Sequence, residues 1–80
     1  MINAGLFEDD VVIINPQKTA LNGDIIIALL GDEATIKRFE IRGTETFLIP
    51  ENVKYTAIPV TNREDFSIVG KVIGIIRWYN

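Results

Sequence analysis

The 80-residue sequence contains no cysteine and no histidine, and each absence removes a class of chemistry. Without cysteine there are no disulfides, thiolate nucleophiles or cysteine-ligated zinc sites. Without histidine, Ser-His-Asp and Cys-His catalysis and histidine-ligated metal sites are excluded as well. Few enzymatic mechanisms remain after these exclusions.

Positive charge is also scarce, with 8 Lys and Arg against 11 Asp and Glu and a net charge of −3. This balance argues against direct contact with nucleic acid or with an anionic membrane. The longest apolar run, residues 25–30, is far shorter than the roughly 20 residues that a membrane span needs. We therefore expect no signal peptide, no membrane contact and a cytoplasmic location.

The residues that are abundant favour β-structure. Isoleucine, valine and threonine account for 26 of the 80 residues, against 10 for leucine and alanine, and β-branched side chains favour strands over helices. Glycine and proline signals separate the apolar runs. The sequence predicts a mainly β fold of short antiparallel strands at residues 11–15, 24–30, 34–41, 45–49, 55–60 and 67–78, the last of which is long enough to bend at Gly70 or Gly74.

Two turns predict a local register. A two-residue type II′ turn at Gly31-Asp32 places Ile26 opposite Lys37, and a turn at Arg42-Gly43 places Leu48 opposite Lys37 on the other side. Lys37 then lies in the middle of three strands, on the more apolar face of its own strand. One interpretation is that its stem packs on the sheet while its ammonium reaches water. The other is a desolvated amine that can act as a general base.

Several blocks in the sequence together resemble a known family. They are Asn22-Gly23-Asp24, Glu33-Ala34-Thr35-Ile36-Lys37-Arg38, Leu48-Ile49-Pro50-Glu51-Asn52 and the segment 68–77. In this order they resemble the C-terminal domain of LexA and UmuD, the self-cleaving Ser-Lys peptidases, over nearly the whole chain. The resemblance implies that Lys37, in the Thr-x-Lys-Arg block, is the catalytic general base.

The resemblance also implies that the nucleophile lies outside this sequence. In the family the serine belongs to a Gly-x-Ser-Met block, and counting back from Glu8-Asp9-Asp10 places Met1 on the methionine of that block. Residues 1–80 are thus expected to be a partial LexA-like peptidase and dimerisation domain, incomplete at the N-terminus, without the nucleophile segment, the hinge or the DNA-binding domain. Ser67, the only serine, is expected to be structural.

The expected function is that of the self-cleavage and dimerisation domain of a LexA-like repressor of the SOS (DNA-damage) response. By the same resemblance, its partners would be a second copy and the RecA filament. A UmuD-like mutagenesis factor and a non-catalytic β interaction module remain alternatives. We expect no cofactor and no metal, since the acidic run Glu8-Asp9-Asp10 is more typical of a solvated turn than of a cation site.

The C-terminal strand is expected to form the dimer contact. Residues 72–78 are rich in β-branched side chains, and an uncovered apolar edge is a template for another strand. An antiparallel pairing with a second copy would bury Ile76 and Trp78. The alternative is that this strand is central in the sheet and that Trp78 caps the core.

Overall fold

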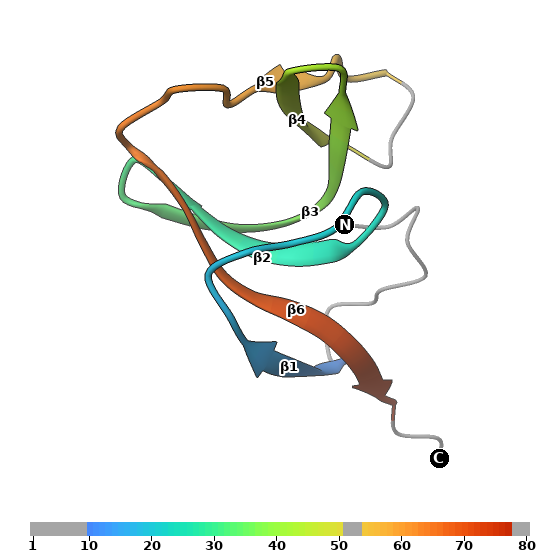
Figure 1. Ribbon diagram of the computed structural model, residues 1–80. Coiled ribbons are helices and arrows are strands. Elements are labelled where there is room, and N and C mark those ends of the chain that lie inside the picture. Colours follow the sequence, from blue (N-terminus) through green and yellow to red (C-terminus); the bar gives the residue numbers. More distant parts are fainter. Residues whose placement is uncertain (1–9, 51–53, 78–80) are drawn as a thin grey trace.

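The computed structural model describes residues 10–50 and 54–77, which form one antiparallel sheet of six strands (Figure 1). The strands are β1 (Val11–Pro16), β2 (Ile25–Leu30), β3 (Glu33–Arg42), β4 (Glu45–Ile49), β5 (Ile58–Pro59) and β6 (Phe66–Ile76). Their order across the sheet is β1-β6-β2-β3-β4-β5. The predicted mainly β fold is confirmed. Over these residues the chain has no helix with the length and apolar character to cross a membrane.

The first predicted hairpin register is confirmed. Gly31 has φ +65°, the positive value that the first central position of a type II′ turn requires, and Leu30 pairs with Glu33 across the turn. From this turn the ladder runs back to the pair Ile26 and Lys37.

The second predicted register is wrong by one position in the turn. Gly43 has φ +63° and is the first central residue, so the turn is Gly43-Thr44 and Arg42 pairs with Glu45. A turn centred on Arg42-Gly43 would put glycine second and would demand a positive φ of arginine, which is unfavourable. Leu48 consequently lies opposite Phe39, two residues along β3 from the expected Lys37.

The last strand, β6, is an interior strand, which corrects the expectation of an uncovered C-terminal edge and agrees with the alternative that this strand is central in the sheet. β6 lies between β1 and β2, because the N-terminal strand returns to pair with it from Val11 opposite Ile76 to Pro16 opposite Gly70. β2 covers the other side of β6 only from Phe66 to Lys71. Trp78, which was expected in this strand, is outside the described residues.

Two β-bulges interrupt β6, at Ile73 opposite β1 and at Val69 opposite β2. Each bulged residue adjoins one of the two glycines, Gly74 and Gly70, at which the sequence predicted a bend. Gly70 also permits a close backbone approach, because a Cβ there would lie 2.8 Å from the carbonyl oxygen of Asn15. The absence of a side chain at Gly70 therefore lets β1 pair with β6.

The core lies on the concave side of the curled sheet. β3 curves so that β4 and β5 rise above β2, and the chain after β5 runs past the β2–β3 hairpin to β6 (Figure 1). The buried apolar side chains come from β2, β3, β4 and the segment after β5: Ile26, Ala28, Phe39, Leu48 and Val60. The β1–β6 end of the sheet extends beyond this cluster, and Val11, Ile13 and Ile76 there remain exposed.

β5 is much shorter than the predicted strand at residues 55–60. Proline has no backbone N–H, so Pro59 limits the ladder with β4 to two residue pairs. Beyond it, the Val60 N–H donates to the Thr46 carbonyl and the Thr46 N–H donates to the Thr61 hydroxyl at 2.8 Å. A side-chain hydroxyl thus replaces the strand pairing.

Candidate functional site

The side chain of Lys37 projects from β3 on the face of the sheet that carries the core. It pairs directly with the fully buried Ile26, and directly paired residues project to the same face of an antiparallel sheet. Lys37 itself is half-buried, and its Nζ lies 3.5 Å from the carbonyl oxygen of Ile36, which makes a long hydrogen bond. The sequence-based placement of Lys37 on the apolar face of β3 is confirmed.

The environment of Lys37 differs from the prediction on the β4 side. β4 ends at Ile49, which pairs with Arg38, so among the described strand residues none lies opposite Lys37 on that side. Of the two cross-strand neighbours predicted for Lys37, Ile26 and Leu48, the described strands pair only Ile26 with it.

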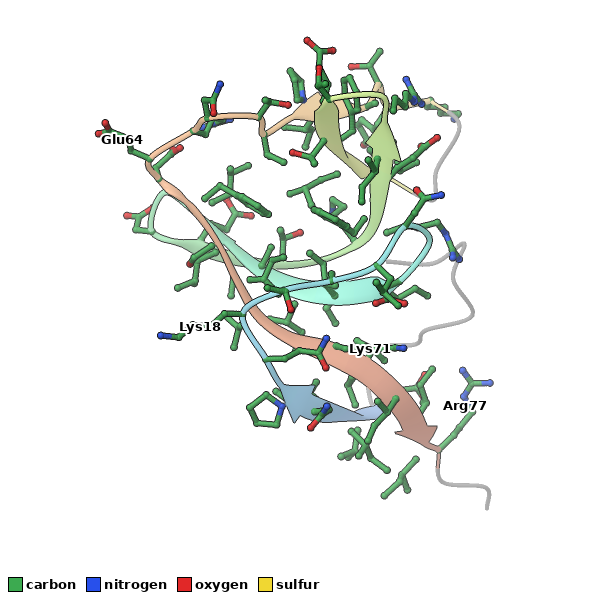
Figure 2. The ribbon with its side chains drawn as sticks, viewed as in Figure 1. Lys18, Glu64, Lys71 and Arg77 are labelled. Atoms are coloured by element: carbon green, nitrogen blue, oxygen red, sulfur yellow. The ribbon has the colours of Figure 1, made fainter. Side chains whose placement is uncertain are left out.

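A second lysine shares the row of Lys37 across the sheet. The registers place Asn15 of β1, Lys71 of β6, Ile26 of β2 and Lys37 of β3 side by side. Neighbouring strands are about 4.8 Å apart, so the Cα atoms of the two lysines are roughly 10 Å apart with the Ile26 side chain between them. Lys71 extends from β6 toward the side of the sheet on which β2 begins (Figure 2).

Asp24 is the partner of Lys71. The Lys71 Nζ lies 3.3 Å from Asp24 Oδ1, and the side chain of Asp24 is only 14% exposed. The other carboxylate oxygen accepts the Leu21 N–H at 2.9 Å. The backbone hydrogen bond from Leu21, supported by the hydrogen bond and charge of Lys71, holds the pKa of Asp24 below its ordinary value against the opposing effect of burial.

The turn at residues 21–24 fixes β3 beside Lys37. The Gly23 N–H donates to the Phe39 carbonyl at 2.8 Å, and the Phe39 N–H donates to the Asp24 carbonyl at 2.7 Å. The Asn22 side-chain oxygen accepts the Ile41 N–H at 2.8 Å. Sequence reasoning used Asn22-Gly23-Asp24 as a turn signal and as a block of the family resemblance, but it missed this anchoring. It also missed the ion pair of Asp24 with Lys71, because the two residues are distant in sequence and share no motif.

The only serine of the chain is not placed to react with Lys37. Ser67 lies on β6 opposite Leu29 of β2, and strand alternation puts Leu29 on the face opposite to Ile26. Ser67 and Lys37 therefore project from opposite faces of the sheet. This agrees with the expectation that Ser67 is structural.

The acidic run near the N-terminus is described only at Asp10, since Glu8 and Asp9 lie outside the described residues. The Asp10 side chain is 3% exposed and is paired with Arg77, which differs from the expected solvated turn. Arg77 can bind it because the start of β1 lies beside the end of β6. In the described part of the chain no cluster of three or more acidic side chains is arranged to hold a metal ion.

Comparisons with known proteins point to one family. The Peptidase S24-like family model matches residues 1–73. The chain is 48% identical over 77 residues to a LexA repressor of Caldicellulosiruptor saccharolyticus, an alignment that covers 96% of the chain and 37% of the repressor. It is 46% identical over 77 residues to a LexA repressor of Acetivibrio thermocellus, covering 96% and 35%. It is 48% identical over 79 residues to a LexA repressor of Clostridium perfringens, covering 99% and 37%.

These alignments cover nearly all of this chain but little more than a third of the length of each relative. The similarity extends across Lys37, the turn at residues 21–24 and the strands that position them, because the matched region includes all of these elements. The resemblance inferred from the sequence blocks is therefore confirmed at the level of the family.

Proposed function

The chain belongs to the Peptidase S24-like family, and on this basis we propose that it is the self-cleavage and dimerisation domain of a LexA-like repressor of the DNA-damage response. Residues 1–80 form part of this domain, and the DNA-binding domain, the hinge and the nucleophilic serine belong to other segments of the protein. The LexA repressors to which the chain is similar over 92–99% of its length support this assignment.

Lys37 is the general base in this proposal. A serine hydroxyl becomes an effective nucleophile when a neighbouring base takes its proton, and a lysine can do so only in its neutral form, which burial favours. The Lys37 Nζ would accept the proton of the serine Oγ while the Oγ bonds to the carbonyl carbon of the scissile peptide. The proton would then pass to the leaving amine as the peptide C–N bond breaks.

The observation that carries this assignment is the position of Lys37 on the core face of the sheet. It is half-buried beside the fully buried Ile26, and no described residue of β4 is paired with it on its other side. A lysine whose ammonium only reaches water does not require a half-buried position on the core face. A base that must meet a serine from another segment needs both features.

The partners follow from the same family membership. The protein would act as a homodimer and would cleave itself when a RecA filament stabilises its cleavable conformation. It would be cytoplasmic, would need no cofactor, and would contact DNA through another domain. A UmuD-like factor is the alternative within the family, and a non-catalytic β interaction module is the alternative outside it.

Peptide cleavage in trans tests the proposal. The 80-residue chain should not cleave a hinge peptide at alkaline pH, because Ser67 lies on the face opposite to Lys37. The same chain extended upstream through the Gly-x-Ser block should cleave it. Cleavage by the 80-residue chain, or no cleavage by a folded extended chain, would contradict the proposal that Lys37 acts with a serine from the upstream segment.

A further inference from the structure

Three charged side chains near the middle of the sheet share its core face. Lys37, Lys71 and Asp24 lie around Ile26, with the two lysines on either side of it and Asp24 two residues before it. Asp24 is diagonal to both lysines in the sheet, a relationship that brings Cα atoms to about 7–8 Å. One carboxylate is thus within reach of two ammonium groups.

The other charged side chains of the described strands are placed differently. Glu33 shares this face but lies at the far end of β3, four residues from Lys37, or roughly 13 Å along the strand. Arg38, Glu40 and Arg42 alternate to the opposite face of β3, and Glu45, the one charged residue of β4, pairs with Arg42. β1, β2 and β6 contribute no other charged side chain than Lys71.

The structure shows which lysine takes the carboxylate. Lys71 is paired with Asp24 at 3.3 Å, whereas the hydrogen bond of the Lys37 Nζ is to a neutral carbonyl oxygen. A carboxylate paired with Lys37 would stabilise its ammonium form and oppose its work as a base. An unpaired Lys71 ammonium would do the reverse, because two like charges at this separation disfavour each other.

We propose that Asp24 and Lys71 form an ion pair that keeps the charge of each from acting on the base, Lys37. Lys71 keeps Asp24 from pairing with the base, and Asp24 neutralises the charge of Lys71. The proposal rests on the proposed role of Lys37 as general base. The titration that tests it requires no peptidase activity, so failure of this proposal can be distinguished from failure of the proposed function.

Two substitutions with opposite expected effects test the pair. Asp24→Asn removes the carboxylate, keeps an oxygen that can accept the Leu21 N–H, and leaves the Lys71 ammonium uncompensated. Lys71→Met keeps most of the stem and leaves the carboxylate free to attract Lys37. The pH midpoint of the Lys37 Nζ and Cε NMR signals should fall by about half a pH unit in Asp24→Asn and rise by a similar amount in Lys71→Met.

The double variant Asp24→Asn with Lys71→Met should return the Lys37 midpoint close to that of the unmodified chain. Asp65→Asn, which breaks the exposed ion pair with Arg63 in another loop, is the matched control and should leave it unchanged. In the extended, cleaving chain, the pH profile of cleavage should shift in the same directions. Lys37 midpoints that are equal in the two single variants, or that shift in the same direction, would overturn the proposal.

Discussion

Arg77 and Asp10 join the two ends of the described chain. The Arg77 Nε donates to Asp10 Oδ1 at 2.9 Å and its Nη2 donates to Oδ2 at 2.8 Å, so the guanidinium binds both carboxylate oxygens. The pair closes the end of the β1–β6 ladder, where Val11 faces Ile76. Figure 2 shows Arg77 beyond the end of β6.

Because the Asp10 carboxylate is almost fully buried, loss of its guanidinium should be costly. Arg77→Met should lower the free energy of unfolding by about 2 kcal/mol, less than for a fully buried pair because Arg77 is partly exposed. Urea denaturation measures this effect. Arg63→Met, which removes the exposed partner of Asp65, is the control and should change stability by less than about 0.5 kcal/mol. Equal effects in both variants would show that the Asp10 pair contributes no more to stability than the exposed pair.

Gly70 should tolerate no side chain. In Gly70→Ala the new Cβ would lie 2.8 Å from the Asn15 carbonyl oxygen, a backbone atom that can move only if β1 shifts. We expect a loss of about 1–3 kcal/mol in unfolding free energy together with chemical-shift changes along β1. Gly74→Ala is the matched control, since the nearest atom there is a side-chain carbon of Ile13 at 3.5 Å. Equal stability of the two variants would contradict the close approach at Gly70.

Acid should destabilise the fold partly through Asp24 and Asp65. Hydrogen bonds from Leu21 to Asp24 and from Arg63 to Asp65, aided by the nearby cations, hold the pKa of each carboxyl below its ordinary value of 3.8. Their contribution is therefore present above pH 3.8 and is lost as the pH falls through the lowered folded-state values. The drop in urea midpoint between pH 6 and pH 3 should be smaller in Asp24→Asn. An identical drop would show that Asp24 contributes nothing to acid sensitivity.

The dimer contact at the C-terminal strand stays a prediction, and the structure confines it to the last few residues of β6. From Ile73 to Ile76, β1 lies on one side of β6, and no strand described in residues 10–50 and 54–77 lies on the other. Ile76 is 41% exposed there. Ile76→Lys should weaken dimerisation in sedimentation experiments, while Leu21→Lys, in the exposed turn before β2, should not. A dimer of unchanged affinity in Ile76→Lys would place the interface elsewhere.

The sequence predicted the features that depend on local chemistry. The β class follows from the excess of β-branched residues, and the β2–β3 register follows from a glycine at the one turn position that requires a positive φ. The same rule, applied with glycine in the wrong turn position, misplaced Leu48 opposite Lys37. The turns Arg42-Gly43 and Gly43-Thr44 differ only in whether Gly43 is the second or the first central residue, and the sequence around Gly43 is compatible with both.

Other features depend on contacts between distant segments, which no local pattern encodes. The return of β6 between β1 and β2 joins strands from opposite ends of the chain. The same crossover brings Lys71 to Asp24 and Arg77 to Asp10. Lys37 could be proposed as the base because its family block is contiguous in sequence, whereas its neighbour Lys71 on β6 became apparent only from the sheet topology.

The role of Lys37 as general base is tested most directly by the pH dependence of peptide cleavage in the chain extended upstream through Gly-x-Ser. Lys37→Ala should reduce the cleavage rate at least about 100-fold, as expected for loss of a general base, and should remove the rise in rate toward alkaline pH. Lys18→Ala, at an exposed lysine that points away from the sheet (Figure 2), should leave both unchanged. A folded Lys37→Ala variant that retains the rate and the alkaline rise would contradict the assignment of Lys37 as the base.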